Sequence, residues 1–275
     1  MVAPEHDYVV SLEPEFITPQ DGAEKQDCEQ AAVQRWTHRN AWRFAPHSVT
    51  ILADDLHSRQ PTCAMLLRHN LNFIMVCKPE SHPFVSEQLD ELSRLNALTQ
   101  CVVKAWNGRY REVWTYRFVN DVLLRNSADA LALNWCELTI TRVDTQAVLY
   151  HNTFITNHRI TDQNVAALVR SGRARWKTEN ENHNTFKNHG YHLEHNFGHG
   201  KEHLANFLLA LNLLAFLLHT ALSLTETAYQ LIRQTLGARK RFFNDICTLT
   251  QYMHFASWPE LMAFMYYGLE IEGSP

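Results

Sequence analysis

The sequence lacks the signals of several common protein classes. Its six cysteines are scattered without a CxxC pair, which argues against a disulfide scaffold or a zinc knuckle and indicates a reducing compartment. Basic residues are not in excess, because 25 Lys and Arg stand against 29 Asp and Glu, so any nucleic-acid binding must depend on local patches. The first ten residues, MVAPEHDYVV, contain no basic region of a secretory signal. These absences together predict a cytoplasmic protein.

One long apolar run is present at residues 203–222, HLANFLLALNLLAFLLHTAL, and it is long enough to span a bilayer. Two histidines and two asparagines interrupt it: His203, Asn206, Asn212 and His219. No cluster of Lys or Arg flanks its far end. A helix that is apolar all round is also typical of a protein core. We therefore expect a buried core helix and no membrane partner.

Residues 49–78 have the pattern of a strand, a helix and a second strand. VTILA (49–53) and NFIMVCK (72–78) are short apolar runs, which indicates buried strands. SRQPTCAMLLRHNL (58–71) is typical of a helix that begins near Pro61. Short connections between these elements predict a parallel pair with a crossover helix. Other elements are expected as a strand at 8–17 and helices at 24–40 and 84–97.

Residues 101–155 have a different composition, in which aromatic and β-branched residues dominate three or four runs. NGR at 107–109 predicts a hairpin turn between two of them. We expect these antiparallel hairpins to be an insertion that forms a layer separate from the parallel pair. Helical patterns resume at residue 161 and continue towards the C-terminus. The predicted fold class is α/β.

Two adjacent aspartates, Asp54 and Asp55, follow the expected strand at 49–53. Open α/β sheets place ligands at the carboxyl ends of parallel strands. Glu179 and Glu181 lie on the helical region after the insertion, and carboxylates from a strand end and a helix can hold two hard cations for attack on a phosphodiester. A simpler role exists for each pair, because aspartates after a strand often cap a helix and TENEN is typical of a solvated helix face. The residues alone leave both interpretations open.

Four strings resemble DDE transposases of bacterial insertion sequences: LEPEFITPQDGAEKQDCEQAAVQRW (12–36), ILADDLHSRQP (51–61), NFIMVCKPESH (72–82) and RWKTENENHNTFKNHGYHLEHNFGHGKEHLANFLLALNLLAF (175–216). The resemblance covers nearly the whole chain and is to the cut-and-paste type, whose ribonuclease-H-like core is interrupted by a β insertion. It implies three regions, namely an incomplete core at 1–98, the insertion at 99–160, and the catalytic-glutamate helix with C-terminal helices that complete the core at 161–275.

The resemblance implies two catalytic carboxylates. The family's second aspartate follows a strand as (A/G)D-x-L, which falls on Asp54, with Asp55 as the alternative. Its glutamate follows RW-x-x-E, which falls on Glu179. The match departs from the family pattern at two positions. Gly172 stands where the family has a tyrosine, and Lys187 lies one residue away from the position of the family's lysine. Glu181 therefore remains the alternative. The implied cofactor is Mg²⁺ or Mn²⁺, held by Asp54 and Glu179.

The family's first catalytic aspartate has no counterpart in the sequence. It belongs on a core strand upstream of the segment at 8–17, and only seven residues precede that segment. Asp7 and Asp21 lie at the wrong positions relative to the expected sheet. Two carboxylates bind Mg²⁺ weakly without substrate phosphates, and the reaction needs two metal ions. We therefore expect a truncated transposase whose chain does not cleave DNA alone.

Basic residues on the helix beyond the insertion are the candidate DNA contacts: Arg170, Arg173, Arg175, Lys177 and Lys187. The resemblance implies DNA at transposon ends as a partner, together with a second copy of the chain or an intact transposase. The alternative function is a non-catalytic DNA- or transposase-binding remnant that interferes with an intact relative.

A third hypothesis is a zinc site in the histidine-rich joint, because spacings of three and four residues bring imidazoles together on a helix. The histidines of this joint are His189, His192, His195, His199 and His203. Glycines interrupt the joint, so we do not expect a shared helical face.

Overall fold

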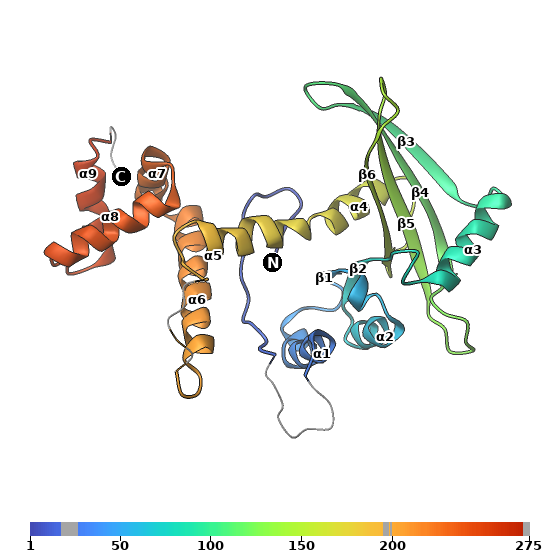
Figure 1. Cartoon of the computed structure of the whole chain (residues 1–275), viewed down its shortest axis with the longest axis horizontal. Coiled ribbons are helices and arrows are strands. Elements are labelled where there is room, and N and C mark those ends of the chain that lie inside the picture. The colour runs from blue at the N-terminus through green and yellow to red at the C-terminus, as the bar shows by residue number, and fades with distance from the viewer. Residues whose placement is uncertain (18–26, 195–197, 199, 272–275) are drawn as a thin grey trace. The chain divides into compact units, whose positions relative to one another are not determined.

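The computed structural model describes residues 1–17, 27–194, 198 and 200–271. The chain divides into two compact units. Glu15–Arg175 form the first, which we name the sheet unit, and Met1–Pro14 together with Trp176–Pro275 form the second, which we name the helical unit. Figure 1 shows the helices and strands of both units.

The sheet unit is built on one six-stranded sheet with the order β1-β2-β6-β5-β4-β3. Its strands are β1 (Thr50–Ala53), β2 (Asn72–Val76), β3 (Thr99–Trp106), β4 (Arg111–Leu123), β5 (Ala132–Arg142) and β6 (Val148–Thr156). β1 and β2 are parallel and are joined by helix α2 (Gln60–Arg68), as the sequence predicts. The remaining pairs are antiparallel, and Gly108 lies at positive φ in the predicted turn between β3 and β4.

The expectation that the antiparallel hairpins form a separate layer is wrong. β6 pairs with β2, with Ile74 opposite Thr156 and Val76 opposite Phe154, so the hairpins extend the sheet of the parallel pair. The physical reason lies in β2, in which every residue is buried. A strand that is apolar on both faces and buried needs a hydrogen-bonding neighbour on each side, and β1 supplies only one of them.

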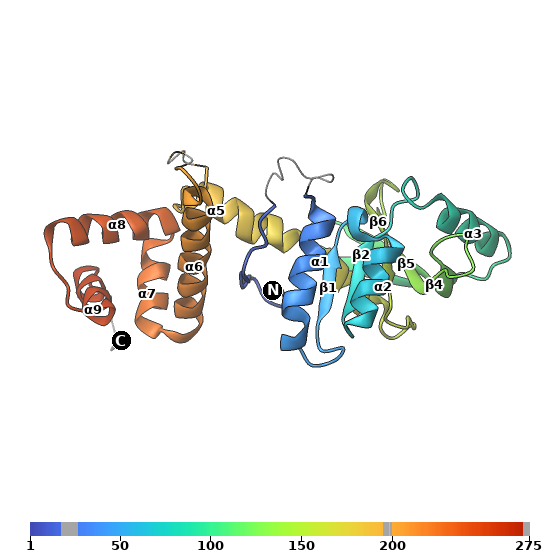
Figure 2. The ribbon, with the colours of Figure 1, turned by 90° about the horizontal axis from the view of Figure 1, so that it is seen from below.

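Each face of the sheet carries its own apolar cluster, because side chains alternate along a strand. On one face, Phe73 and Met75 pack with residues of α1 (Glu29–Asn40), α2 and α3 (Pro83–Arg94). On the other face, Ile74 and Val76 pack with α4 (Val165–Arg173). Figure 2 shows α1 and α2 side by side along β1 and β2. The sheet is therefore covered on both sides where the parallel pair lies.

Gly172, which stands where the transposases that the sequence resembles have a tyrosine, lies where α4 closely approaches the sheet. A Cβ atom at this position would lie 2.9 Å from Cγ2 of Ile74 and 3.0 Å from Cδ1 of Phe154. These contacts leave no room for a tyrosine. The glycine thus allows the close packing of α4 on β2 and β6.

The helical unit contains the π-helical segment η3 (Thr178–His183) and helices α5 (Asn184–Asn188), α6 (Leu204–Thr225), α7 (Thr227–Leu236), α8 (Arg239–Tyr252) and α9 (Trp258–Gly268). The prediction of a strand at 8–17 is wrong. In the described residues, this segment takes part only in an isolated β bridge, between Val2 and Val9. The residues just before this segment are bound by a side chain: the carbonyl groups of Ala3, Pro4 and His6 accept hydrogen bonds from Lys177.

The expectation that the apolar run is a buried core helix is also wrong. Only 11% of the apolar window of α6 is buried, although the helix is long and apolar enough to cross a membrane. One side, with Phe216 and Thr220, packs within the helical unit. Much of the remaining surface is apolar and exposed, with large side chains at Leu204, Phe207, Leu211, Leu214 and Leu218. Short neighbouring helices such as α7 cover too little of a 22-residue helix to bury it.

Candidate metal site and DNA-contacting residues

Asp54 follows β1 directly, at the carboxyl end of the parallel pair. Its side chain is exposed, and one carboxylate oxygen accepts a hydrogen bond from the backbone N–H of Leu56 at 3.1 Å, as the N-cap of a short 3₁₀ helix at Asp55–His57. Among the described residues, its other oxygen has no hydrogen-bond partner. The capping interpretation therefore describes the local role of Asp54, and one oxygen is left for a cation.

Asp55 has a different environment, which separates the two adjacent aspartates. Its carboxylate accepts a hydrogen bond from the backbone N–H of Lys78 at 2.7 Å and lies 3.7 Å from Nε2 of His82. The hydroxyl of Ser58 lies 2.7 Å from the same imidazole nitrogen. Burial, and then the charge of Arg59, lower the pKa of His82, and Asp55 opposes them. Asp55 thus links the end of β1 to the end of β2.

The sequence does not reveal this network of Ser58, Asp55 and His82. His82 stands in an ordinary loop string, PESH, and no spacing rule connects it to a serine 24 positions away. Two residues of the network come from the β1 end and one from the β2 end, and only the parallel pairing brings these ends together. The network matters for the candidate site because it fixes the loop on which Asp54 lies.

β1 is the terminal strand of the sheet, and this edge lies beside the loop that carries Asp54. Its four residues are each partly buried, in contrast to the fully buried residues of β2. Parallel strands are usually buried inside a sheet with neighbours on both sides. An edge strand also presents unpaired backbone groups that can pair with another strand. A strand added at this edge would bring its own side chains next to Asp54.

Glu179 and Glu181 both lie on η3 and are exposed. A π-helical turn is rare and is frequent at functional sites, because its wider spacing redirects side chains. The two glutamates belong to the helical unit and Asp54 to the sheet unit, so the structure gives the surroundings of each carboxylate separately. No group of three metal-binding side chains occurs in the part of the chain that the structure describes.

Carboxylate oxygens are suitable ligands for Mg²⁺ or Mn²⁺, and Asp54 fits as one such ligand because it is exposed and retains an oxygen without a partner. Glu179 fits by exposure and charge, as does its alternative Glu181. Among the described residues, no group of three or more metal-binding side chains supports the zinc hypothesis. Two of its five histidines, His195 and His199, lie outside those residues.

The predicted DNA contacts have unequal environments. Arg170 is exposed on α4, and Arg175 follows that helix and is half-buried. The guanidinium of Arg173 stacks on two rings of the sheet, with its Cζ atom 4.4 Å from the ring centre of Tyr150 and 5.3 Å from that of Trp114. These three arginines belong to the sheet unit.

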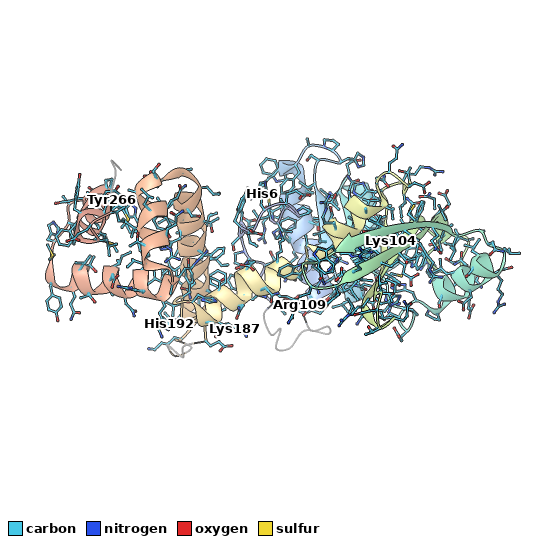
Figure 3. The ribbon with its side chains drawn as sticks, turned by 90° about the horizontal axis from the view of Figure 1, so that it is seen from above. His6, Lys104, Arg109, Lys187, His192 and Tyr266 are labelled. Carbon is cyan, nitrogen blue, oxygen red and sulfur yellow. The ribbon has the colours of Figure 1, made fainter. Side chains whose placement is uncertain are left out.

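The two lysines belong to the helical unit and are both engaged. Lys177 is buried, and its ammonium group donates hydrogen bonds to the carbonyl groups of Ala3, Pro4 and His6 at 3.2, 3.0 and 2.6 Å. Lys187 is exposed on α5, where Figure 3 labels it, and forms an ion pair with Glu194 at 2.8 Å. The ammonium group of Lys177 therefore anchors the N-terminal segment, whereas Lys187 is accessible to a phosphate group.

Comparison with known proteins adds no family assignment. No protein-family model matches the chain, and no curated protein matches it.

Proposed function

We propose that this chain derives from a DDE transposase and takes part in metal-dependent phosphodiester cleavage and strand transfer during DNA transposition. The proposal rests on one observation, which is the exposed carboxylate of Asp54 at the end of a parallel strand that forms the open edge of the sheet. Ligand sites of open α/β sheets lie at such strand ends. The resemblance in four strings of the sequence is the second support.

In this proposal, Asp54 and Glu179 supply two of three carboxylates, and Mg²⁺ or Mn²⁺ is the cofactor. Bound divalent cations activate water and stabilise the leaving oxygen in reactions of this kind. The third carboxylate comes from a strand that pairs with the outer edge of β1. Asp55 stabilises the loop through Lys78 and His82 and is not a metal ligand. Cleavage in this proposal requires all three carboxylates together.

The DNA contacts follow from the same arrangement. Arg170 and Arg175 contact backbone phosphates in this proposal, because Arg170 is exposed on α4 and Arg175, which is half-buried, follows directly after that helix. Lys187 contributes from the helical unit after exchange of its ion pair with Glu194. Arg173 contributes less, since its guanidinium already stacks on Tyr150 and Trp114.

The experiment supplies a strand with the proposed third carboxylate in trans. The full chain is mixed with a synthetic segment that carries the first core strand of an intact family member, and cleavage of transposon-end DNA is measured with Mg²⁺ or Mn²⁺. We expect cleavage only in the mixture, and a loss of at least about a hundredfold in Asp54→Asn and Glu179→Gln. Glu181→Gln is the matched control and is expected to retain activity, whereas Asp55→Asn loosens the loop that carries Asp54 and is expected to lose less activity than Asp54→Asn. Cleavage that is equal in Asp54→Asn and the unaltered chain contradicts the proposal.

The alternative is a non-catalytic partner that interferes with an intact transposase through mixed assembly. One observation favours it, namely the exposed apolar stripe of α6, whose residues Leu204, Phe207, Leu211, Leu214 and Leu218 are spaced by three and four. This spacing is that of a seam between two helices. If the alternative holds, the chain forms complexes with an intact relative that Leu211→Glu abolishes and Asp54→Asn does not affect.

A further inference from the structure

The helical unit contains a polar cluster enclosed by aromatic rings, which we name the His219 cluster and define as His219, Tyr191, Arg233, Arg239 and Trp258. His219 lies on α6, Arg233 on α7, Arg239 on α8 and Trp258 on α9. Tyr191 lies in the segment between α5 and α6. The ring of His219 lies 6.3 Å from that of Tyr191 and 6.2 Å from that of Trp258. Four other segments of the helical unit thus place a side chain near the imidazole of His219.

Four hydrogen-bond donors in this cluster are buried and make no well-formed hydrogen bond in the part of the chain that the structure describes, where Arg239 interacts only weakly with the hydroxyl of Tyr191. They are Nη1 of Arg233, Nη1 of Arg239, the hydroxyl of Tyr191 and Nε1 of Trp258. A buried polar group without a partner costs about 1–3 kcal/mol, and a charged one costs more. Four such atoms in one cluster are uncommon in a folded protein, and all of them can donate to the same type of acceptor.

The cluster also has an excess of positive charge. Among the described residues, neither Arg233 nor Arg239 forms an ion pair with a carboxylate, and the two guanidinium groups repel each other. His219 does not add a charge near neutral pH, because burial, and then Arg239 and Arg233, lower its pKa to about 4. Two unbalanced cations remain inside the helical unit.

The guanidinium groups are held in fixed orientations. Cζ of Arg239 lies 5.5 Å from the ring centre of Phe216, and Cζ of Arg233 lies 5.5 Å from that of Phe242. Nη2 of Arg233 donates to the carbonyl of Gly237 at 3.4 Å, which leaves Nη1 for another acceptor. Stacked guanidinium groups with preset donors are typical of sites that recognise phosphate.

We propose that the His219 cluster binds a phosphate-type oxyanion, which accepts hydrogen bonds from Arg233, Arg239, Tyr191 and Trp258. A tetrahedral anion offers four acceptor oxygens and offsets both positive charges. The phosphate is either free inorganic phosphate or a phosphate group of DNA, because the chemistry is the same. This inference does not depend on Asp54, Glu179 or the proposed transposition activity.

The test measures thermal unfolding of the full chain in phosphate and in chloride at equal ionic strength. We expect phosphate to raise the Tm saturably, by about 5 °C at a hundredfold excess over Kd. Arg239→Met and Arg233→Met remove the shift, and each variant is at least as stable as the unaltered chain in chloride because one repelling charge is gone. Arg241→Met is the matched control, since Arg241 is exposed on the same helix as Arg239, and it keeps the full shift.

Two gentler variants cover the case in which the methionine variants fail to fold. Tyr191→Phe and Trp258→Phe keep the ring packing and each remove one donor, so each lowers phosphate affinity about fivefold in calorimetric titration. A duplex oligonucleotide in phosphate-free buffer distinguishes the two sources of the anion. The proposal is overturned if neither phosphate nor the duplex gives a saturable shift, or if the shift is equal in Arg239→Met and the unaltered chain.

Discussion

The two compact units use their apolar residues differently. The sheet unit buries apolar side chains on both faces of one sheet, in a cluster that contains Phe73 and another that contains Leu138. The helical unit buries aromatic clusters around Tyr266 and Phe216 but leaves the apolar surface of α6 largely exposed. Alternation in a strand specifies which residues face each side, whereas a uniformly apolar helix does not specify its buried face. Sequence is therefore a better guide to the sheet unit than to the helical unit.

The largest expected effect is on α6, where neighbouring apolar residues differ in burial. Phe216→Ala is expected to destabilise the helical unit by about 3–5 kcal/mol, because Phe216 is only 2% exposed and packs between Tyr191 and Phe186. Leu214→Ala is the matched control, with a cost below about 1 kcal/mol, because Leu214 is 61% exposed. Hydrogen exchange measured by mass spectrometry reports the stability of each unit. Equal costs for the two variants would show that another surface covers the exposed stripe.

The next effect depends on pH and concerns His219 in the helical unit. Burial, and then Arg239 and Arg233, lower the pKa of His219 to about 4, against about 6.5 in the unfolded chain. The unfolded state therefore binds a proton first as the pH falls, and stability is full above pH 6.5 and declines towards pH 4. We expect a loss of about 2 kcal/mol from the helical unit over this range. In His219→Gln, this loss of unfolding free energy on acidification is expected to disappear, which urea titrations at pH 7 and pH 4.5 measure. An unchanged loss would contradict the assignment of the effect to His219.

A third comparison uses the same substitution with opposite expected signs. Gly172→Ala is expected to destabilise the sheet unit by about 1–3 kcal/mol, because the new Cβ lies 2.9 Å from Ile74. Gly268→Ala, at the end of α9, meets no atom within 4 Å and is expected to stabilise the helical unit by about 0.5 kcal/mol. Differential scanning calorimetry measures both. Stabilisation by Gly172→Ala would contradict the close approach of α4 to the sheet.

The smallest expected effect separates the adjacent aspartates. Asp54→Asn is expected to change the free energy of unfolding by less than about 0.5 kcal/mol, because asparagine also caps the helix that follows. Asp55→Asn is expected to cost about 1–2 kcal/mol, because it weakens the contacts with Lys78 and His82. Urea unfolding measures both. A larger cost for Asp54→Asn would assign that residue a structural role and weaken its assignment as a metal ligand.

Several parts of the fold can be predicted from the sequence for identifiable reasons. The runs VTILA and NFIMVCK give β1 and β2 because they are short, apolar and bounded by turn residues. The antiparallel strands follow from aromatic and β-branched runs around a glycine turn. The pairing of β6 with β2 cannot be predicted in this way, because the choice of a neighbouring strand depends on contacts between residues distant in sequence.

The candidate site is predictable only in part. Asp54 follows a strand, and this local pattern correctly places it at the rim of the sheet. The network of Asp55, Ser58 and His82 and the His219 cluster depend on tertiary packing, and no sequence spacing indicates them. The role of Lys177 is a similar case, because a lysine in a basic stripe donates to carbonyl groups more than 170 residues away.

Iron-mediated cleavage of the polypeptide tests whether Asp54 and Glu179 hold the same metal ions. In the mixture of the chain, the supplied strand segment and transposon-end DNA, Fe²⁺ replaces Mg²⁺, and ascorbate with peroxide then cuts the backbone next to bound metal. We expect cuts close to Asp54 and close to Glu179 in the same sample, and the loss of both sets in Asp54→Asn. Cuts that fall only in the histidine-rich joint, or that persist near Glu179 in Asp54→Asn, would contradict a shared metal site.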